Sequence, residues 1–328
     1  MNNRFLIPST DSGASSISDR YDVSTGGFSP NDMKGCLSIN VRDVALIFEG
    51  GGMRAAHTAA VLNTLLKNNV YFADVYGISA GSTNVVNYIS RDSQRARRSF
   101  VEFIGEKHVA GLGQMLLGNG YFNSRLIYQK SGEPDGLLPF DYDTFMANPA
   151  QMHIESYEVD SGRTVEWTKA DIGNLKDLMT MVQASSSMPV VMPVVSFRGH
   201  RYLDGGLGDS WGIMLDAAIR DGYERFFVVC TQPQGFRKSP SKRPWLNKLL
   251  MGKHPDVLYR SEQRYRFYNE IYDRLDTLAS EGRALVYHPQ IMELKNTTID
   301  RAKLATAYEQ GLAQSEREFD SWRDFLDV

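Results

Sequence analysis

Apolar residues form short unbroken runs near the start of the chain, and small residues follow each run. Val44 to Phe48 is a continuous apolar run of the kind that forms a strand buried on both faces. After the glycines at 50–52, apolar positions between Val61 and Leu66 recur at helical spacing. A second strand is predicted from Phe72 to Tyr76, followed by a second helix that extends to Ile89. This order of strand, turn, helix, strand, turn and helix predicts a parallel sheet.

The rest of the chain continues this alternation less regularly. Alternating positions at 152–159 and 164–168, on either side of Asp160-Ser161-Gly162, predict a hairpin. The other predicted elements are helices at 172–183, 211–221 and 299–326, a short strand that ends at Tyr202-Leu203, and strands at 226–230 and 284–287. No internal repeat is visible. We therefore expect a mobile leader at 1–40 and one α/β domain at 41–328, with a helical part at 255–328.

Composition limits the class of protein without naming a function. The 328 residues are enough for one large α/β domain, and a net charge of −3 argues against a nucleic-acid partner. The two cysteines, Cys36 and Cys230, are far apart, which indicates a reducing compartment rather than a disulfide framework. The sequence shows neither an apolar run long enough to span a membrane nor the apolar stretch of a signal peptide. We expect a cytoplasmic protein.

The two predicted strand-to-helix turns carry the first signs of chemistry. The second turn, GISAG at 77–81, fits the G-x-S-x-G pattern of a nucleophile elbow, which exposes the hydroxyl of its serine, Ser79. The first turn holds three glycines at 50–52. In a parallel sheet both turns open at the same edge, and glycine N–H groups beside a helix N-terminus form an anion-binding nest. The pattern predicts an oxyanion hole that faces Ser79.

The glycine turn also has a second interpretation. Gly50 to Ala55 fits G-x-G-x-x-A, a form of the dinucleotide-binding fingerprint, and Asp74 lies near the expected position of the ribose-binding acid. That acid should end the second strand, whereas Asp74 is followed by Val75-Tyr76 and then by the serine turn. A nucleotide-binding oxidoreductase is therefore kept as the alternative function.

A serine nucleophile needs a base, and the chain offers two kinds. The order of an α/β-hydrolase triad would require a histidine after the acid, such as His254 or His288, while His57 is expected to pack or hydrogen-bond on the first helix. The stretch HRYLDGG at 200–206 instead places Asp204 at the end of a short strand, before two glycines that form a tight loop. The run ASSSMP at 184–189 is compatible with a loop that lines the same cleft.

Together, GGGMR, GISAG, the AS-x-x-x-P run and DGG resemble the patatin-like phospholipase family over about residues 42–235. The motif glycines are Gly50, Gly77, Gly81, Gly205 and Gly206. The resemblance implies a three-layer α/β/α sandwich with a mainly parallel central sheet, a Ser–Asp dyad without histidine or metal, and hydrolysis of acyl esters, often of lipids. It assigns the dyad to Ser79 and Asp204 and the oxyanion hole to Gly51, Gly52, Met53 and Arg54. Ala55 stands where the family usually has its last motif glycine, which we expect to shift helix–strand packing.

Three segments outside the motifs bear on the substrate and its location. Residues 236–254 hold six Lys or Arg and no acid, interleaved with Trp245 and other apolar residues, which suits either an anionic membrane surface or a surface helix packed on its own domain. Residues 111–140 predict a cap over an acyl pocket or an ordinary connection, and the arginines at 91–98 predict a solvated helix face.

The sequence as a whole predicts a cytoplasmic serine acyl-ester hydrolase that acts on lipids without a cofactor, in peripheral contact with the inner face of a membrane. The alternatives are the nucleotide-binding oxidoreductase and a binding protein that keeps the patatin fold without turnover.

Overall fold

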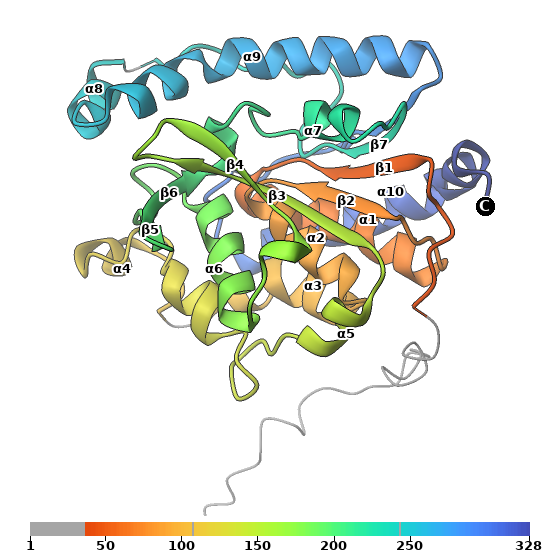
Figure 1. Ribbon diagram of the computed structural model, residues 1–328, viewed down its shortest axis with the longest axis horizontal. Coiled ribbons are helices and arrows are strands. Elements are labelled where there is room, and N and C mark those ends of the chain that lie inside the picture. Colours follow the sequence, from red (N-terminus) through yellow and green to blue (C-terminus); the bar gives the residue numbers. More distant parts are fainter. Residues whose placement is uncertain (1–36, 107, 243) are drawn as a thin grey trace, which may run out of the picture. The chain divides into compact units, whose positions relative to one another are not determined.

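Eight strands form one mixed sheet in the computed structural model, which describes residues 37–106, 108–242 and 244–328 (Figure 1). The strands are β1 Val44–Phe48, β2 Asp74–Gly77, β3 Gln151–Glu158, β4 Arg163–Trp167, β5 Val195–Phe197, β6 His200–Asp204, β7 Arg225–Val229 and β8 Ala284–Tyr287. Their order is β5-β6-β3-β2-β1-β7-β8, and β4 pairs with β3. Residues 1–36 of the expected leader lie outside the described residues, while Asn40 at its end hydrogen-bonds to the carbonyl of Asn69.

The centre of the sheet is parallel, as the sequence predicts. Strand β1 runs parallel to β2 and β7, β2 runs parallel to β3, and β7 runs parallel to β8. The predicted hairpin is the antiparallel pair β3–β4, and β5 and β6 extend the sheet beyond β3 with antiparallel pairing. The turns that follow β1 and β2 therefore open at the same edge of the sheet.

Helices cover both faces of the sheet. The helices are α1 Ala55–Lys67, α2 Ala80–Ile89, α3 Ser93–Phe100, α4 Leu112–Leu116, α5 Tyr142–Ala147, α6 Leu175–Ser186, α7 Leu215–Arg220, α8 Pro244–Met251, α9 Pro255–Ser280 and α10 Arg301–Leu326. None of them, within the described part of the chain, is long and apolar enough to cross a bilayer.

The side chains of β1 show how the layers are held. Ala45 and Ile47 pack with buried residues of α7 and α9, whereas Val44, Leu46 and Phe48 pack with those of α1, α2, α6 and α10. Figure 1 shows α7 and α9 above the sheet and α1, α2, α6 and α10 below it. This is the three-layer α/β/α sandwich that the resemblance implied.

Two elements differ from their predicted positions for physical reasons. The second strand is predicted at Phe72 to Tyr76 but lies at Asp74–Gly77, because Phe72 makes only an isolated bridge to Val41 and the strand continues into the serine turn. The 26-residue α9 was predicted only as part of a helical segment. It buries only a narrow stripe of residues and is polar elsewhere, so the helical spacing of its apolar residues is hard to recognise in the sequence.

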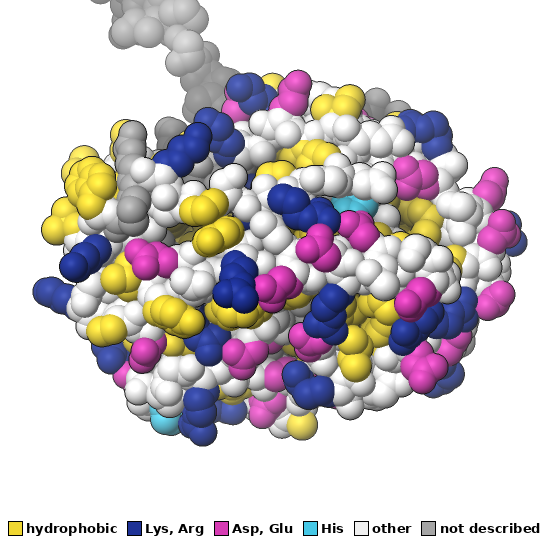
Figure 2. All heavy atoms as spheres, turned by 90° about the horizontal axis from the view of Figure 1, so that it is seen from above, with side chains coloured by type: hydrophobic (Ala, Val, Ile, Leu, Met, Phe, Trp, Pro, Cys, Tyr) yellow, Lys and Arg dark blue, Asp and Glu magenta, His cyan; other side chains and the backbone are white. Residues whose placement is uncertain are grey.

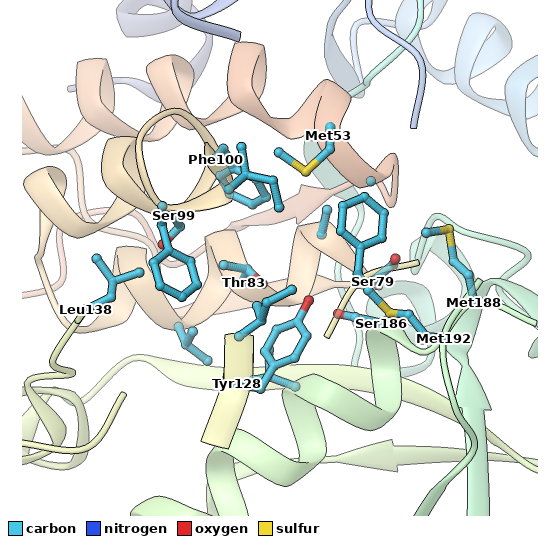
Figure 3. A pocket seen from close by; sticks show the side chains of 18 of the residues that line it. Met53, Ser79, Thr83, Ser99, Phe100, Tyr128, Leu138, Ser186, Met188 and Met192 are labelled. Carbon is cyan, nitrogen blue, oxygen red and sulfur yellow. The ribbon is translucent and has the colours of Figure 1, made fainter. Parts of the chain in front are cut away.

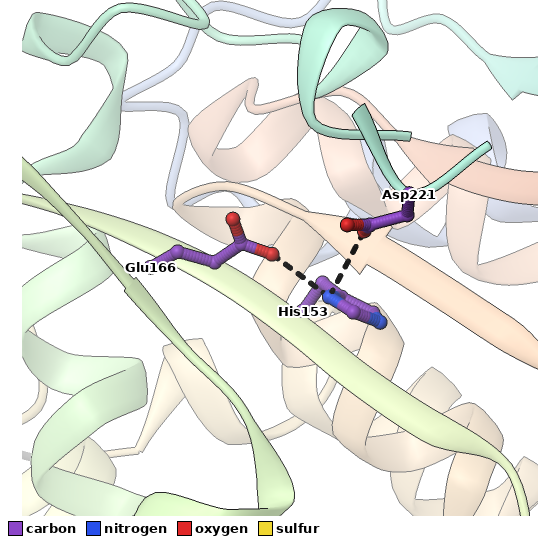
Figure 4. Close-up of side chains that lie close together, drawn as sticks. All are labelled: His153, Glu166 and Asp221. Atoms are coloured by element: carbon purple, nitrogen blue, oxygen red, sulfur yellow. Dashed lines mark hydrogen bonds and ion pairs between the residues drawn. The ribbon is translucent and has the colours of Figure 1, made fainter. Parts of the chain in front are cut away.

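A network of charged side chains lies at the edge of the sheet where β2 and β3 begin, opposite the edge that carries the glycine and serine turns (Figure 4). His153 Nε2 lies 2.9 Å from Asp74 Oδ1, and its Nδ1 lies 2.8 Å from Glu166 Oε1. Asp221 is the next carboxylate, 3.7 Å from Nδ1. Burial lowers the pKa of His153, but its hydrogen bonds to Asp74 and Glu166 outweigh burial and raise the pKa to about 9.

The same atoms have the spacing of a metal site, since ligand atoms of His153, Glu166 and Asp221 lie within 4.8 Å of one another. Both imidazole nitrogens, however, face carboxylate oxygens. Two hydrogen bonds of this kind require the doubly protonated imidazolium, which has no lone pair to offer a metal. We interpret the group as an ion network that joins β2, β3 and β4 to the end of α7.

The network makes stability depend on pH in a predictable direction. The folded pKa of His153, about 9, lies above its ordinary value of 6.5, so its stabilising effect is complete below pH 6.5 and disappears as the pH rises through 9. We expect the free energy of unfolding to fall by up to about 3 kcal/mol across this window in the native protein, and much less in His153→Gln. Urea unfolding at several pH values measures this effect. The exposed His200 provides the control, and a His153→Gln curve parallel to that of His200→Gln would contradict the assignment.

Candidate active site

Ser79 occupies a strained turn between β2 and α2, with φ 57° and ψ −125°. Such a backbone conformation is costly for a non-glycine residue and is typical of a nucleophile elbow. The flanking glycines make room for it: a Cβ on Gly81 would lie 2.3 Å from the carbonyl oxygen of Phe48, and one on Gly77 would lie 2.6 Å from that of Gly81. Any larger residue would push the serine turn away from the end of β1.

Strand pairing brings Asp204 to this turn. Strand β2 ends at Gly77, opposite Ile154 of β3, and Asp204 pairs with Ser156 two residues further along the same strand. The last turn of α6 holds both ends of the arrangement. The backbone N–H of Ser79 donates to Ser185 Oγ at 3.0 Å, and that of Asp204 donates to the carbonyl of Ser187 at 2.9 Å. The small-residue run at 184–189 thus lies at the cleft, as expected.

One oxygen of the Asp204 carboxylate accepts a hydrogen bond, and the other is open, that is, without a hydrogen-bond partner in the described part of the chain. Oδ1 accepts the N–H of Gly206 at 2.7 Å, while the buried Oδ2 makes no hydrogen bond of normal geometry within the described residues. The Ser79 hydroxyl is nonetheless close enough to affect Asp204. Burial raises the pKa of Asp204, and the charge of Arg264 and the Ser79 hydroxyl oppose part of that rise. Catalytic hydrogen bonds are often loose without substrate.

The glycine turn lies against the serine turn. A Cβ on Gly50 would be 3.2 Å from the Cβ of Ser79, and Gly52, at φ 56°, occupies the left-handed region that favours glycine. Within the described residues, the N–H groups of Gly51 and Gly52 donate to no protein acceptor. Ala55, in place of the usual last glycine, is the fully buried first residue of α1.

The other two residues expected in the oxyanion hole have their N–H groups engaged. That of Met53 donates to the carbonyl of Asn296 at 3.0 Å, and that of Arg54 contacts the carbonyl of Gly51 at 3.4 Å. Asn296, in the loop before α10, has no motif around it, so this contact could not be predicted from its neighbours in the chain. Of the four expected donors, only the N–H groups of Gly51 and Gly52 are without a protein acceptor among the described residues.

An apolar pocket opens beside Ser79 (Figure 3). Its apolar lining comprises Met53, Val86, Phe100, Phe103, Ile104, Phe122, Ile127, Leu138, Met179, Val182, Met188 and Met192. Residues of the 111–140 segment, among them Tyr128, form part of its wall. The largely apolar lining can accommodate a hydrocarbon chain that extends from Ser79.

Two of the arginines predicted on a solvated helix face are instead buried, which corrects that prediction. Arg91 donates to the carbonyl of Ser38, and Arg95 donates to that of Leu138 and lines the far part of the pocket. Arg95 lies on the buried side of α3, while Arg91 lies in the turn before that helix, and the spacing of the arginines did not reveal either position.

No histidine hydrogen-bonds to Ser79 or Asp204 in the described part of the chain. His57 pairs with the Tyr287 hydroxyl at 2.7 Å, as expected for a structural residue, and burial lowers its pKa to about 4. His288 Nδ1 contacts the carbonyl of Gln232, and His254 precedes α9. Asp74, the proposed ribose-binding acid, begins β2 and so lies at the opposite edge from the glycine turn.

The close approach of Gly81 to β1 is open to a direct test. We expect Gly81→Ala to lower the free energy of unfolding by about 1–3 kcal/mol, because the new methyl group must displace the Phe48 carbonyl. Gly113→Ala is the matched control, since its methyl group would meet nothing within 4 Å. Urea unfolding compares the two variants with the native protein. Equal stability of Gly81→Ala and Gly113→Ala would show that the turn can accommodate a methyl group beside the Phe48 carbonyl.

Comparisons with known proteins give two family matches and one curated relative. The family model described as "Patatin-like phospholipase" matches residues 46–216, just over half of the chain, and a domain of unknown function, DUF6363, matches residues 254–327. The uncharacterized protein YjjU of Escherichia coli (strain K12) is 24% identical over 268 residues, which are 76% of this chain and 69% of that protein.

Among solved structures, VipD from Legionella pneumophila aligns with 85% of this chain and 67% of its own, at 11% identity and a TM-score of 0.44. The family match covers the end of β1, the glycine turn, the serine turn and the Asp204 loop. The chain belongs to the patatin-like phospholipase family.

Proposed function

We propose that the protein hydrolyses carboxylic acyl esters, chiefly of lipids, with Ser79 as nucleophile and Asp204 as base. One observation carries the proposal: the strained Ser79 lies between an apolar pocket and the open oxygen of a buried carboxylate. A serine that only capped a helix would need neither neighbour.

The chemistry follows from these positions. Asp204 takes the proton of Ser79 as the hydroxyl oxygen attacks the ester carbonyl carbon. The N–H groups of Gly51 and Gly52 stabilise the oxyanion, an effect of roughly 3–4 kcal/mol per donor, and the dipole of α2 adds to it. When the tetrahedral intermediate collapses, Asp204 returns the proton to the leaving alkoxide. The alcohol then leaves, and water attacks the acyl-enzyme carbonyl with Asp204 again as base. When this second intermediate collapses, Asp204 returns the proton to the Ser79 oxygen and the carboxylic acid is released.

Burial is what makes a carboxylate useful here. An ordinary aspartate is a weak base for a hydroxyl, and desolvation raises the pKa of Asp204. The base must be ionised to act, so the rate should fall as the pH drops through this raised pKa.

Four substitutions assayed on one short p-nitrophenyl ester test the dyad. We expect Ser79→Ala and Asp204→Asn each to lower kcat/KM by roughly 10⁴-fold or more, because each removes a group that moves in the transition state. His254→Ala and His288→Ala should cost at most a few-fold. A fluorophosphonate should label the native protein at Ser79, and circular dichroism checks folding.

Two outcomes would overturn parts of this proposal. Loss of activity in either histidine variant, with Asp204→Asn still active, would replace the dyad by a triad. Native protein that neither labels nor turns over any ester would leave a binding protein with the patatin fold.

We also propose peripheral contact with an anionic membrane through α8, joined by α4. Figure 1 places both helices toward the same end of the molecule, and Figure 2 shows hydrophobic side chains gathered at the α8 end of the face seen from above. The exposed apolar residues are Leu112, Met115, Leu116 and Leu117 around α4, and Trp245, Leu249 and Leu250 on α8. Met251 packs inward with Val257, while Trp245, Leu249 and Leu250 of the same helix stay exposed.

Vesicle binding tests this contact. Trp245→Ala combined with Leu249→Ser should weaken binding to anionic vesicles by roughly 10-fold or more, since apolar burial and lysine attraction act together. Binding of the native protein should also fall when salt is raised, because screening shortens the attraction to about 10 Å at 0.1 M. Ile219→Ser on α7, another exposed apolar position, is the control. Equal binding to neutral vesicles would contradict the charge contribution.

A further inference from the structure

A buried guanidinium lies at the end of the apolar pocket that is far from Ser79. The side chain is that of Arg95 on α3, which is 6% exposed and lines the pocket. Its Nε donates to the carbonyl of Leu138 at 3.3 Å, and its backbone carbonyl accepts the hydroxyl of Ser99 at 2.7 Å. Figure 3 shows Ser99 and Leu138 on the opposite side of the pocket from Ser79. The nucleophile and this cation therefore lie at two ends of one cavity.

The charge of Arg95 is held among neutral groups. Nη1 donates to the side-chain oxygen of Asn87, and the guanidinium carbon lies 4.9 Å from the ring centroid of Phe140. Asp92 accepts the backbone N–H of Arg95 at 2.8 Å, but no carboxylate of the described residues forms an ion pair with the guanidinium. Burial lowers the pKa of Arg95 to about 10, and the charge of Asp92 opposes only part of this effect. A buried cation without a counter-charge is costly to hold in a fold.

One nitrogen of the guanidinium is available to a ligand. Nε and Nη1 donate to the protein, whereas Nη2 donates to no protein acceptor in the described part of the chain. Nη2 is also absent from the fully buried atoms that have no hydrogen-bond partner, so it keeps some accessible surface. The side chain lines the pocket, and a guanidinium presents its N–H groups in a planar fork that matches a carboxylate.

The length of α2 gives the distance that an acyl chain must cover. Ser79 immediately precedes α2, Thr83 and Val86 of this helix line the pocket, and Asn87, which contacts Arg95, follows Val86. At a rise of about 1.5 Å per residue, the helix covers about 12 Å from Ser79 to Asn87, which an extended chain of about 8–10 carbon atoms spans. An acyl chain of this length, bound with its ester at Ser79, brings its far end to the guanidinium.

The chemistry of that far end then matters. A methyl group would remove water from the guanidinium without offering it an acceptor, whereas a carboxylate would pair with its charge. We propose that Arg95 binds a carboxylate at the far end of the acyl chain, and that the preferred substrate is a half-ester of a dicarboxylic acid of about 8–10 carbon atoms. Lipids whose acyl chain ends in a carboxylate belong to this class. The assignment rests on the proposed function, because it takes the pocket beside Ser79 as the acyl site.

Binding to the full-length Ser79→Ala protein tests the assignment without turnover. The probes are methyl hydrogen decanedioate, which ends in a carboxylate, and methyl decanoate, which ends in a methyl group, both measured by isothermal titration. We expect the carboxylate probe to bind at least roughly 10-fold more tightly, and the further substitution Arg95→Gln to reduce that ratio by roughly 5-fold or more. Arg95→Lys keeps the charge and should restore part of the ratio. Arg98→Gln, at an exposed arginine of the same helix, is the matched control and should leave the ratio unchanged.

A comparison of chain lengths provides a second test that needs no substitution at Arg95. Methyl hydrogen hexanedioate is too short to reach the guanidinium from Ser79, so it should bind no more than roughly 2-fold more tightly than methyl hexanoate. The preference for a carboxylate should therefore appear only in the longer pair. This test stands even if an Arg95 variant does not fold, which thermal melts would reveal.

Three outcomes would overturn the assignment. Equal affinity for methyl hydrogen decanedioate and methyl decanoate would show that the pocket does not select a carboxylate. The same preference in the short pair would place the carboxylate at another cation of the protein. A folded Arg95→Gln variant that keeps the ratio would do the same. Turnover of a p-nitrophenyl ester by the native protein tests the proposed function separately, since a protein without turnover could still show the carboxylate preference.

Discussion

The contact between the serine turn and the end of β1 is the constraint on which the site depends. Gly81 lies so close to the Phe48 carbonyl that even a methyl group would overlap it. That contact holds Ser79 beside Gly50 of the glycine turn. Parallel pairing of β1 and β2 aligns the two turns. The turns can come into contact only because glycines without a Cβ stand at their closest points.

The strands and turns of this region could be predicted because local sequence determines them. Val44 to Phe48 is buried along its whole length, and GISAG forms the expected turn between a strand and a helix. The Asp204 loop was also found from its motif, since two glycines after a short strand leave few other structures. Motifs of this kind predict structure correctly because the glycines are required by contacts within the turn or with the strand beside it.

The surroundings of the site could not be predicted, because they depend on contacts far apart in sequence. Asn296 and Arg264 reach the site from segments with no pattern that marks them. Arg95 has the spacing of a surface residue, yet the fold turns it toward the pocket. The environment that sets the charge of Asp204 comes from tertiary packing, not from the residues next to it in the chain.

The candidate site depends on a strand, β7, that lies outside the range matched by the family model. Strand β7 follows the family-matched range and pairs with the full length of β1, directly behind the glycine turn. Without it, β1 would become an edge strand with its backbone hydrogen-bonding groups open. The loop that carries Asn296 also closes over the glycine turn from outside that range. The motifs and the chain after residue 216 therefore form one structural unit, and a gene fragment that carries only the motifs would leave the glycine turn without these supports.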